Sequence, residues 1–85
     1  MITIDVLVTR VEGVRRADLE RWIANRWVRP DDEGAEPVFH DIDVARVRLI
    51  RELRDELEVN EAALPVVLSL LDQVYELRRR LAGRP

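Results

Sequence analysis

The sequence predicts a small, mainly α-helical fold with a single short β-hairpin near its middle. Two long stretches in the C-terminal half have the three-and-four spacing of apolar residues that is typical of amphipathic helices. The N-terminal half contains shorter helical stretches, followed by a proline- and glycine-containing acidic segment. Because 85 residues suit one domain, we expect a single domain over residues 1–85. Residues 1–40 would hold the shorter elements and the hairpin, and residues 41–85 the two longer helices.

The first long helix is expected to begin near Asp41. Asp41 or Asp43 can cap its N-terminus, since a short carboxylate side chain satisfies free backbone N–H groups. The apolar stripe of this helix consists of Val44, Val47, Ile50, Leu53 and Leu57, with Leu49 beside it. The opposite face carries arginines and carboxylates, so we expect it to be solvated.

The second long helix is expected to follow Asn60, a good N-cap, with Pro65 in or just before its first turn. Its apolar residues form two adjacent faces. One face consists of Leu64, Leu68, Leu71 and Tyr75, and the other of Val67, Leu70, Val74, Leu77 and Leu81. A chain of this length has one small core, so a surplus face is expected to contact a second copy. We take the first face as the candidate dimer interface; packing of both faces inside the chain is the alternative.

The N-terminal part is expected to contain a short strand and two short helices. Alternating β-branched residues favour a strand over residues 2–5, and the apolar spacing that follows favours a helix over residues 6–12. Gly13 is expected to end this helix in a left-handed conformation. A second helix is expected over residues 16–25, and we expect Trp22 on its inner face to pack in the core.

The hairpin is predicted by residues 29–37, which two prolines and a glycine interrupt and four carboxylates make acidic. Val38 and Phe39 follow as a short extended piece. Val28 to Phe39 is therefore expected to form a hairpin with an acidic tip. Helix, turn, helix, hairpin, helix is the element order of a winged helix-turn-helix domain.

Composition and motifs argue against an enzyme. The net charge is −3 and the chain has no cysteine, which excludes disulfides, a thiol nucleophile and a cysteine-ligated metal. The only histidine, His40, stands at a helix start, and the only serine, Ser69, has no histidine base in register. We expect no catalytic residue, no cofactor, no metal and no small-molecule substrate. No apolar run approaches the ~18–20 residues that span a bilayer, so we expect a cytoplasmic protein.

Arginines concentrate in the predicted helix-turn-helix, which raises the possibility of DNA binding. The candidate DNA-contacting residues are Arg15, Arg16, Arg21 and Arg26, since guanidinium groups bind phosphates. However, carboxylates are interleaved with them, and residues 15–24 contain no asparagine or glutamine to read bases. DNA binding is therefore the alternative hypothesis.

Residues 13–30 resemble the second helix and wing entry of MerR-type regulators, and residues 37–39 and 46–53 resemble that fold's wing strand and third helix. A closer resemblance is to the CbpM chaperone-modulator family, a branch of this fold. Residues 53–60, LRDELEVN, resemble the run R-L-x-x-D-L-x-V-N of that family, and residues 64–72 resemble its L-x-L-L-D segment. The resemblance extends over nearly the whole chain.

The resemblance implies a MerR-like winged helix-turn-helix fold and a protein partner. Members of the CbpM family bind the J-domain of a DnaJ-like co-chaperone called CbpA and inhibit it, form homodimers and have no cofactor. The chain departs from DNA-binding MerR regulators at Arg15, Glu20, Arg21 and Arg26, where they have serine or threonine, arginine, tyrosine and glycine. These departures favour a non-catalytic modulator of a co-chaperone; a small MerR-like DNA-binding regulator is the alternative.

Two acidic sets are candidate contacts for the J-domain. J-domains resemble one another in carrying a basic helix that meets Hsp70, to which carboxylates are electrostatically complementary. The first set, at the end of the first long helix, consists of Asp55, Glu56 and Glu58. The second set, in the hairpin, consists of Asp31, Asp32, Glu33 and Glu36. Both sets stay open as alternatives.

Overall fold

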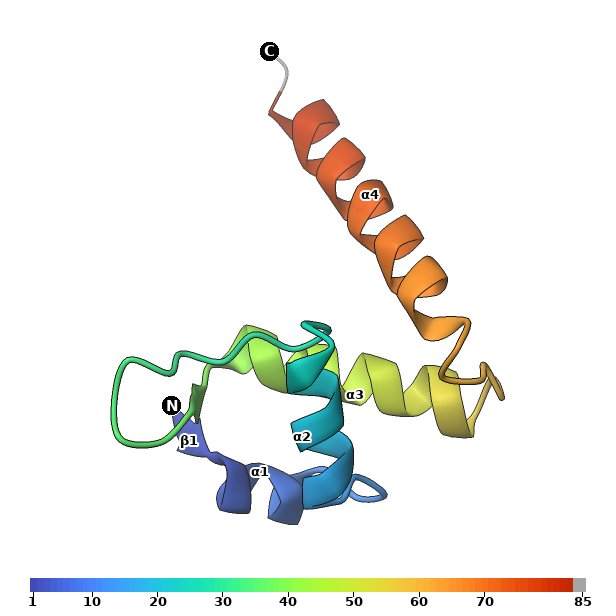
Figure 1. The fold of residues 1–85 in the computed structure, drawn as a ribbon. Coiled ribbons are helices and arrows are strands. Elements are labelled where there is room, and N and C mark those ends of the chain that lie inside the picture. The colour runs from blue at the N-terminus through green and yellow to red at the C-terminus, as the bar shows by residue number, and fades with distance from the viewer. Residues whose placement is uncertain (84–85) are drawn as a thin grey trace.

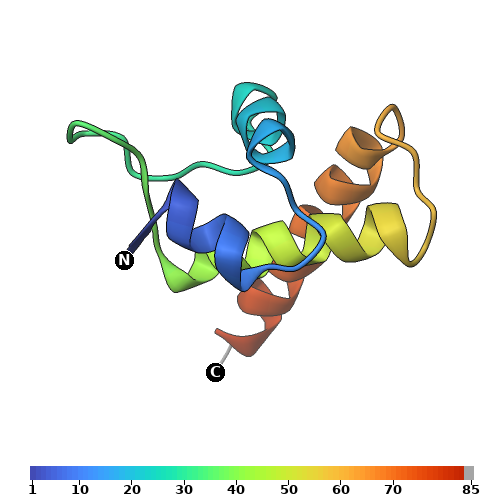
Figure 2. The same cartoon turned by 90° about the horizontal axis from the view of Figure 1, so that it is seen from below.

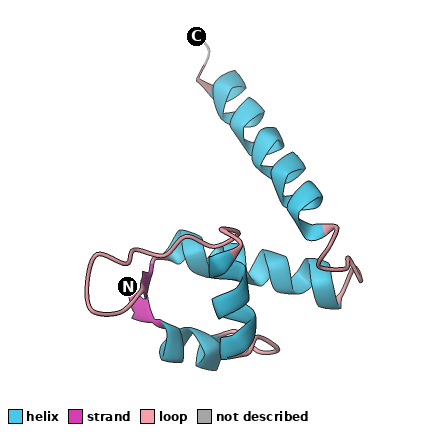
Figure 3. Cartoon of the chain, in the orientation of Figure 1, coloured by secondary structure: helices cyan, strands magenta, loops and turns pink. Residues whose placement is uncertain are grey.

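The structure is a computed structural model that describes residues 1–83, and it confirms the predicted mainly α fold (Figures 1 and 3). The elements along the chain are β1 (Ile2–Thr3), α1 (Ile4–Arg10), α2 (Arg16–Ala24), β2 (Val38–Phe39), α3 (Asp41–Asp55) and α4 (Leu64–Ala82). Helices α1 and α2 form the helix-turn-helix, and α3 follows the wing. The last two residues, 84–85, lie outside the described part.

Strand β1 passes into α1 without a loop. Helix α1 begins at Ile4, two residues earlier than expected, because the Thr3 hydroxyl caps it by accepting a 3.4 Å hydrogen bond from the Val6 N–H. In the turn that follows α1, Gly13 has φ 87°. A Cβ at this position would lie 3.4 Å from Cδ of Arg51, an ordinary contact distance, so the left-handed backbone is what favours glycine here.

Helix α2 presents one face to the core. It begins after Arg15, whose backbone N–H donates a 3.0 Å hydrogen bond to the Asp18 carboxylate. Its buried residues are Leu19 and Trp22, so the prediction of a core tryptophan is confirmed. In the turn after α2, Arg26 has φ 63°, the left-handed conformation that favours glycine.

The wing is a loop closed by one bridge. Asp31 and Val38 exchange two backbone hydrogen bonds, of 3.0 and 2.8 Å, at its base. Strand β2 then pairs antiparallel with β1, with Ile2 opposite Phe39. Within the described chain, residues 32–37 form only bends, as expected for a segment interrupted by proline and glycine. The small sheet therefore ties the N-terminus to the base of the wing.

Helix α3 runs through the centre of the molecule, and it begins at Asp41 as expected, whereas its C-terminal end differs from expectation. His40 occupies the N-cap position, and Asp43 accepts a 2.9 Å hydrogen bond from its N–H. The prediction that Asp41 or Asp43 caps this N-terminus is confirmed for Asp43, which acts from the third helical position. At the other end, Leu57 is 68% exposed, because the helix ends at residue 55 and Glu58, at φ 55°, redirects the chain.

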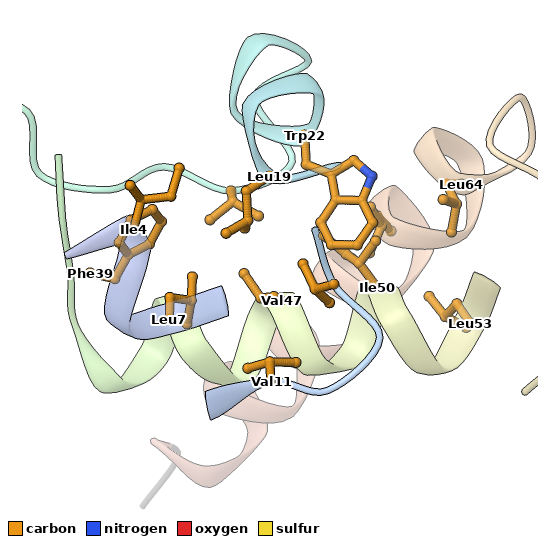
Figure 4. Close-up of a cluster of buried hydrophobic side chains, with 13 residues drawn as sticks. Ile4, Leu7, Val11, Leu19, Trp22, Phe39, Val47, Ile50, Leu53 and Leu64 are labelled. Atoms are coloured by element: carbon orange, nitrogen blue, oxygen red, sulfur yellow. The ribbon is translucent and has the colours of Figure 1, made fainter. Parts of the chain in front are cut away.

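One apolar core joins all four helices (Figure 4). Figure 2 shows from below how these helices are arranged around α3. Figure 4 shows the Trp22 ring pointing from α2 toward Ile50 of α3, with Leu64 of α4 near it. The buried residues are Ile4, Leu7, Val11, Val14, Leu19, Trp22, Val28, Phe39, Val47, Ile50, Leu53, Leu64 and Leu68. None of the buried residues in the described part is charged, so apolar burial holds these helices together.

Helix α4 packs on the rest of the molecule through its N-terminal half, and its C-terminal half projects away (Figure 1). In the preceding turn the Asn60 side chain accepts a 2.9 Å hydrogen bond from the Ala63 N–H, and Pro65 lies in the first turn of the helix, as expected. Leu64 and Leu68 enter the core. The radius of gyration is 13.9 Å, whereas a compact chain of this length has about 12 Å. The difference reflects the projection of α4.

Candidate protein-binding surfaces

The part of α4 beyond the core, residues 69–82 (hereafter the outer α4), exposes a continuous apolar surface. Its exposed large hydrophobic residues are Leu70, Val74, Tyr75, Leu77 and Leu81. They recur at helical spacing and extend over about three turns. Single exposed apolar residues are ordinary, but a continuous apolar face of this kind marks an interaction site.

The four residues of the predicted dimer interface differ in their exposure. Leu64 and Leu68 are buried in the core of the chain itself, with 0% and 2% exposure. Leu71 is half-buried against that core, and only Tyr75, which is 53% exposed, lies on the free surface. The prediction is therefore wrong for Leu64 and Leu68, because the crossing of α4 over α3 turns their face inward. The surplus apolar face is the adjacent one.

A clamp built on Arg46 fixes the direction of α4. The guanidinium of Arg46 donates two hydrogen bonds to the Asp72 carboxylate, of 2.6 and 3.0 Å, and a third, of 2.9 Å, to the backbone carbonyl of Trp27. Such bidentate pairs are geometrically specific. The clamp joins α3, α4 and the turn after α2. The sequence prediction missed it, although Asp72 ends the segment that resembles the CbpM family.

A groove lies against this clamp, between the N-terminal half of α3 and the outer α4. It has a volume of about 570 Å³, which is within the range of ligand-binding clefts. Its apolar lining comes from Trp27, Ile42, Ala45, Leu49 and Tyr75. A second hollow continues it along α4 as far as Arg80.

Two arginines give the groove its charge. Arg26 and Arg29 line it, and both are exposed. Neither forms an ion pair among the residues that the structure describes, and only the Nε of Arg29 makes a long hydrogen bond, of 3.4 Å, to a backbone carbonyl. The two lining carboxylates already have partners, since Asp43 accepts from the His40 N–H and Asp72 pairs with Arg46. The groove therefore combines an apolar floor with available positive charge.

The two acidic sets differ in how far their charges are neutralised. Asp55 pairs with Arg54 at 2.7 Å and Glu56 pairs with Arg51 at 3.2 Å, and the hydrogen bond from Arg54 lowers the pKa of Asp55. In the wing, the only side-chain hydrogen bond is within the loop, from the Glu33 N–H to Asp31. Over residues 1–83, no wing carboxylate forms an ion pair. The wing therefore has the more available acidic surface.

Two of the four arginines predicted to contact DNA, Arg16 and Arg21, are engaged by carboxylates of the chain. Arg16 pairs with Asp5 at 2.5 Å and with Glu20 at 3.1 Å. Arg21 donates to Glu61, at 2.7 Å from its Nε, and to Asp18. These hydrogen bonds, the one with Glu61 above all, raise the pKa of Arg21. Arg15 and Arg26 have no such partner in the described residues. The exposed face of α2 thus carries little net positive charge.

The described residues contain neither a candidate metal site nor a membrane-spanning helix. Residues 1–83 contain no cluster of three or more histidine, cysteine or acidic side chains that is placed to hold a metal ion. Nor does any described helix have the length and apolarity needed to cross a membrane.

A family model described as the MerR HTH family regulatory protein matches residues 2–83, nearly the whole chain. The chain belongs to the MerR helix-turn-helix family. No curated protein and no solved structure matches it significantly. Family membership agrees with the observed order of helix-turn-helix, wing and α3. Regulators of the MerR family often bind DNA and dimerise.

The MerR-type helix-turn-helix is held together here by a second arginine network. Arg54 of α3 donates a 2.9 Å hydrogen bond to the Gly13 carbonyl, pairs with Asp18 at 3.2 Å, and lies 5.2 Å from the ring centre of Trp22. Burial alone would raise the pKa of Asp18, but hydrogen bonds from the Arg15 N–H and from two arginine side chains outweigh it and lower the pKa. The carboxylate of Asp18 therefore serves the fold and is unavailable to a partner.

Proposed function

We propose that this MerR-family chain is a non-catalytic cytoplasmic regulator that binds another protein, a modulator that inhibits a DnaJ-like co-chaperone by binding its J-domain. The observation that carries the proposal is the neutralisation of α2. Of the four arginines predicted to contact DNA, the two on α2, Arg16 and Arg21, are each bonded to two carboxylates of the same chain. If Arg16 and Arg21 were to bind DNA phosphates, they would have to break their ion pairs with these carboxylates. The resemblance to the CbpM family supplies the identity of the partner.

The wing is the better supported of the two acidic candidates for contact with the J-domain. Its carboxylates carry no ion pair in the described residues, whereas Asp55 and Glu56 would have to exchange arginine partners. Available carboxylates on an exposed loop suit a basic helix, because complementary charges accelerate association and fix orientation. The third member of the other set, Glu58, is exposed and is held at a positive φ.

The chain is proposed to act as a homodimer that forms through the outer α4. Leu70, Val74 and Leu81 replace the buried leucines as the expected contacts. Burying such an apolar face between two copies would remove it from water and stabilise the pair.

Titration calorimetry with the J-domain of a DnaJ-like co-chaperone tests the proposal. We expect saturable binding at micromolar concentration that weakens as salt is raised. The triple variant D32N/E33Q/E36Q is expected to bind at least tenfold more weakly. The control, D41N/E52Q, removes two exposed carboxylates on α3 and is expected to bind like the wild type. Absence of binding by folded wild-type protein would refute the proposal.

DNA binding is the second candidate, and membership of the MerR family favours it. Arg15 and Arg26 would be its anchors, because they have no ion pair in the described residues. A fluorescence anisotropy titration with duplex DNA separates the candidates. Salt-dependent binding that R15Q/R26Q abolishes would favour DNA, and we expect none below about 100 μM.

A further inference from the structure

The groove beside the Arg46 clamp has the properties of a docking site whose occupant must be both apolar and anionic. Its floor is formed by Trp27, Leu49 and Tyr75, and Ile42 at its edge is 78% exposed. An exposed isoleucine beside a half-buried tryptophan leaves apolar surface in water, which an apolar occupant would remove. Arg26 and Arg29 stand at the same groove with no carboxylate partner among the described residues.

The backbone at Arg26 adds an independent observation. Its φ of 63° lies in the left-handed region, where glycine is favoured and a side chain introduces strain. A strained residue kept at a surface turn points to a use for its side chain. Here the turn places that side chain at the groove, next to Trp27. The hydrogen bond from Arg46 to the Trp27 carbonyl holds the same turn in place.

We propose that this groove binds a protein segment that carries carboxylates beside large apolar side chains, contributed by the partner that the chain regulates. The proposal rests on the protein-binding function above and adds a second, opposite charge pattern to it. The wing presents carboxylates to a basic surface, and the groove presents arginines to an acidic one. The hollow that continues past Asp72 along α4 makes the site long enough for several residues of an extended or helical segment.

Charge complementarity selects this occupant over a second copy of the outer α4. The C-terminal end of α4 carries Arg78, Arg79 and Arg80, and it keeps a net positive charge because Arg79 and Arg80 share one carboxylate, that of Glu76. A second α4 entering this groove would bring these cations toward Arg26 and Arg29, and like charges in contact are unfavourable. An acidic segment brings the opposite charge.

The test uses three fluorescein-labelled synthetic peptides of 14 residues and anisotropy titrations against the full chain. The first peptide has leucines and phenylalanines at helical spacing with glutamates between them, the second has lysines in place of the glutamates, and the third has serines in place of the apolar residues. We expect the first to bind saturably, with the second and third at least tenfold weaker. Failure of the first peptide to bind, or binding of the second or the third peptide as tightly as the first, would overturn the proposal.

Variants then localise the binding. R26Q/R29Q is expected to weaken binding of the first peptide at least tenfold, while R10Q/R48Q, which removes two exposed arginines outside the groove, changes it less than twofold. A45W fills the groove without changing charge and is expected to weaken binding comparably. Equal losses in the two arginine pairs would mean general electrostatic attraction and would overturn the site.

Sedimentation and J-domain titrations of the same variants separate the remaining outcomes. If A45W or R26Q/R29Q dissociates a homodimer, the occupant is a second copy and the proposal is wrong. If R26Q/R29Q binds the J-domain normally and the wild type binds no peptide, the proposed binding site in the groove is refuted and the proposed J-domain binding stands. Peptide binding that needs Arg26 and Arg29, in a chain that does not bind the J-domain, supports the groove and removes the co-chaperone as partner.

Discussion

The body of the molecule and the outer α4 show two ways in which one short chain handles apolar residues. In the body, the apolar side chains of four helices enclose one another, and Trp22 and Val47 are fully buried. In the outer α4, Leu70 and Leu81 are exposed over more than half of their surface. The contrast shows that the core of the body is covered by its own chain, whereas the apolar face of the outer α4 would be covered only by another molecule.

The largest effect is expected in the body. The variant W22A removes a fully buried indole and is expected to lower the free energy of unfolding by about 3–5 kcal/mol, from lost burial and the cavity that remains. Urea denaturation followed by circular dichroism measures it. A change below about 1 kcal/mol would mean that Trp22 is not part of a tightly packed core.

Polar substitution in the outer α4 is expected to alter association and leave the fold intact. L70S/L81S removes two exposed leucines and is expected to raise the dimer dissociation constant about a hundredfold, or roughly 2.7 kcal/mol, with an unchanged monomer circular dichroism spectrum. The matched control is L57S, which changes an equally exposed leucine outside α4. Sedimentation velocity over a concentration series gives the result. Equal effects of both variants, or a monomeric wild type, would remove the distinction between the two regions.

The boundary between the two regions depends on the Arg46 clamp. R46A removes a bidentate ion pair and a hydrogen bond to the Trp27 carbonyl, and we expect a loss of about 1–2 kcal/mol in unfolding free energy. D72N keeps the side-chain shape and is expected to lose less. Thermal unfolding of the two variants measures the difference. An R46A protein as stable as the wild type would mean that apolar contacts alone hold α4.

Relief of backbone strain is expected to give a smaller change of opposite sign. R26G places glycine at φ 63° and is expected to stabilise the fold by about 0.5–1 kcal/mol, because the strain it removes exceeds the added flexibility of the unfolded chain. E58G, at φ 55°, serves as a second instance outside the groove. G13A is the reverse change and is expected to destabilise. Destabilisation by R26G would indicate that the Arg26 side chain supports the fold.

The pH dependence of stability gives the most gradual effect. The pKa of Asp18 is lower in the folded chain than its ordinary value of 3.8, so its contribution is present in full above the unfolded pKa and is lost as pH falls through the folded value. Unfolding free energy is therefore expected to decline as pH drops below about 4. D18N is expected to be less stable at pH 7 and to show a shallower decline. Parallel pH curves for the two proteins would contradict the role assigned to Asp18.

The sequence predicted the features that depend on local spacing and missed those that depend on how helices cross. The apolar stripe of α3 and the burial of Trp22 follow from helical periodicity, which assigns residues to a face. Periodicity does not decide which of two apolar faces of α4 turns inward, so Leu64 and Leu68 were placed on the wrong side. Arg46 and Asp72, which are 26 residues apart, become partners only through the crossing of α3 and α4.

The same limit applied to the candidate sites. Arg21 and Glu61 gave no sign in the sequence that they would pair across 40 residues, and this pair lowers the pKa of Glu61 as well as neutralising the α2 surface. The groove was missed because its arginines and aromatic residues come from separate elements. Arg26 was the exception, since the resemblance to MerR-type regulators implies a glycine at this position, and the structure places Arg26 at a left-handed turn.

Because the clamp holds α4 near its middle, a small change of angle there produces a large displacement at the end of the helix. Arg46 grips the helix at Asp72, and Ala82 lies ten residues farther on, or about 15 Å along the axis. A tilt of ~10° at the clamp would displace the tip by ~2.6 Å, enough to misalign the leucines that would meet those of a second copy in the proposed homodimer. The contact between Arg46 and Asp72, near the middle of the helix, therefore determines the direction in which the outer α4 projects.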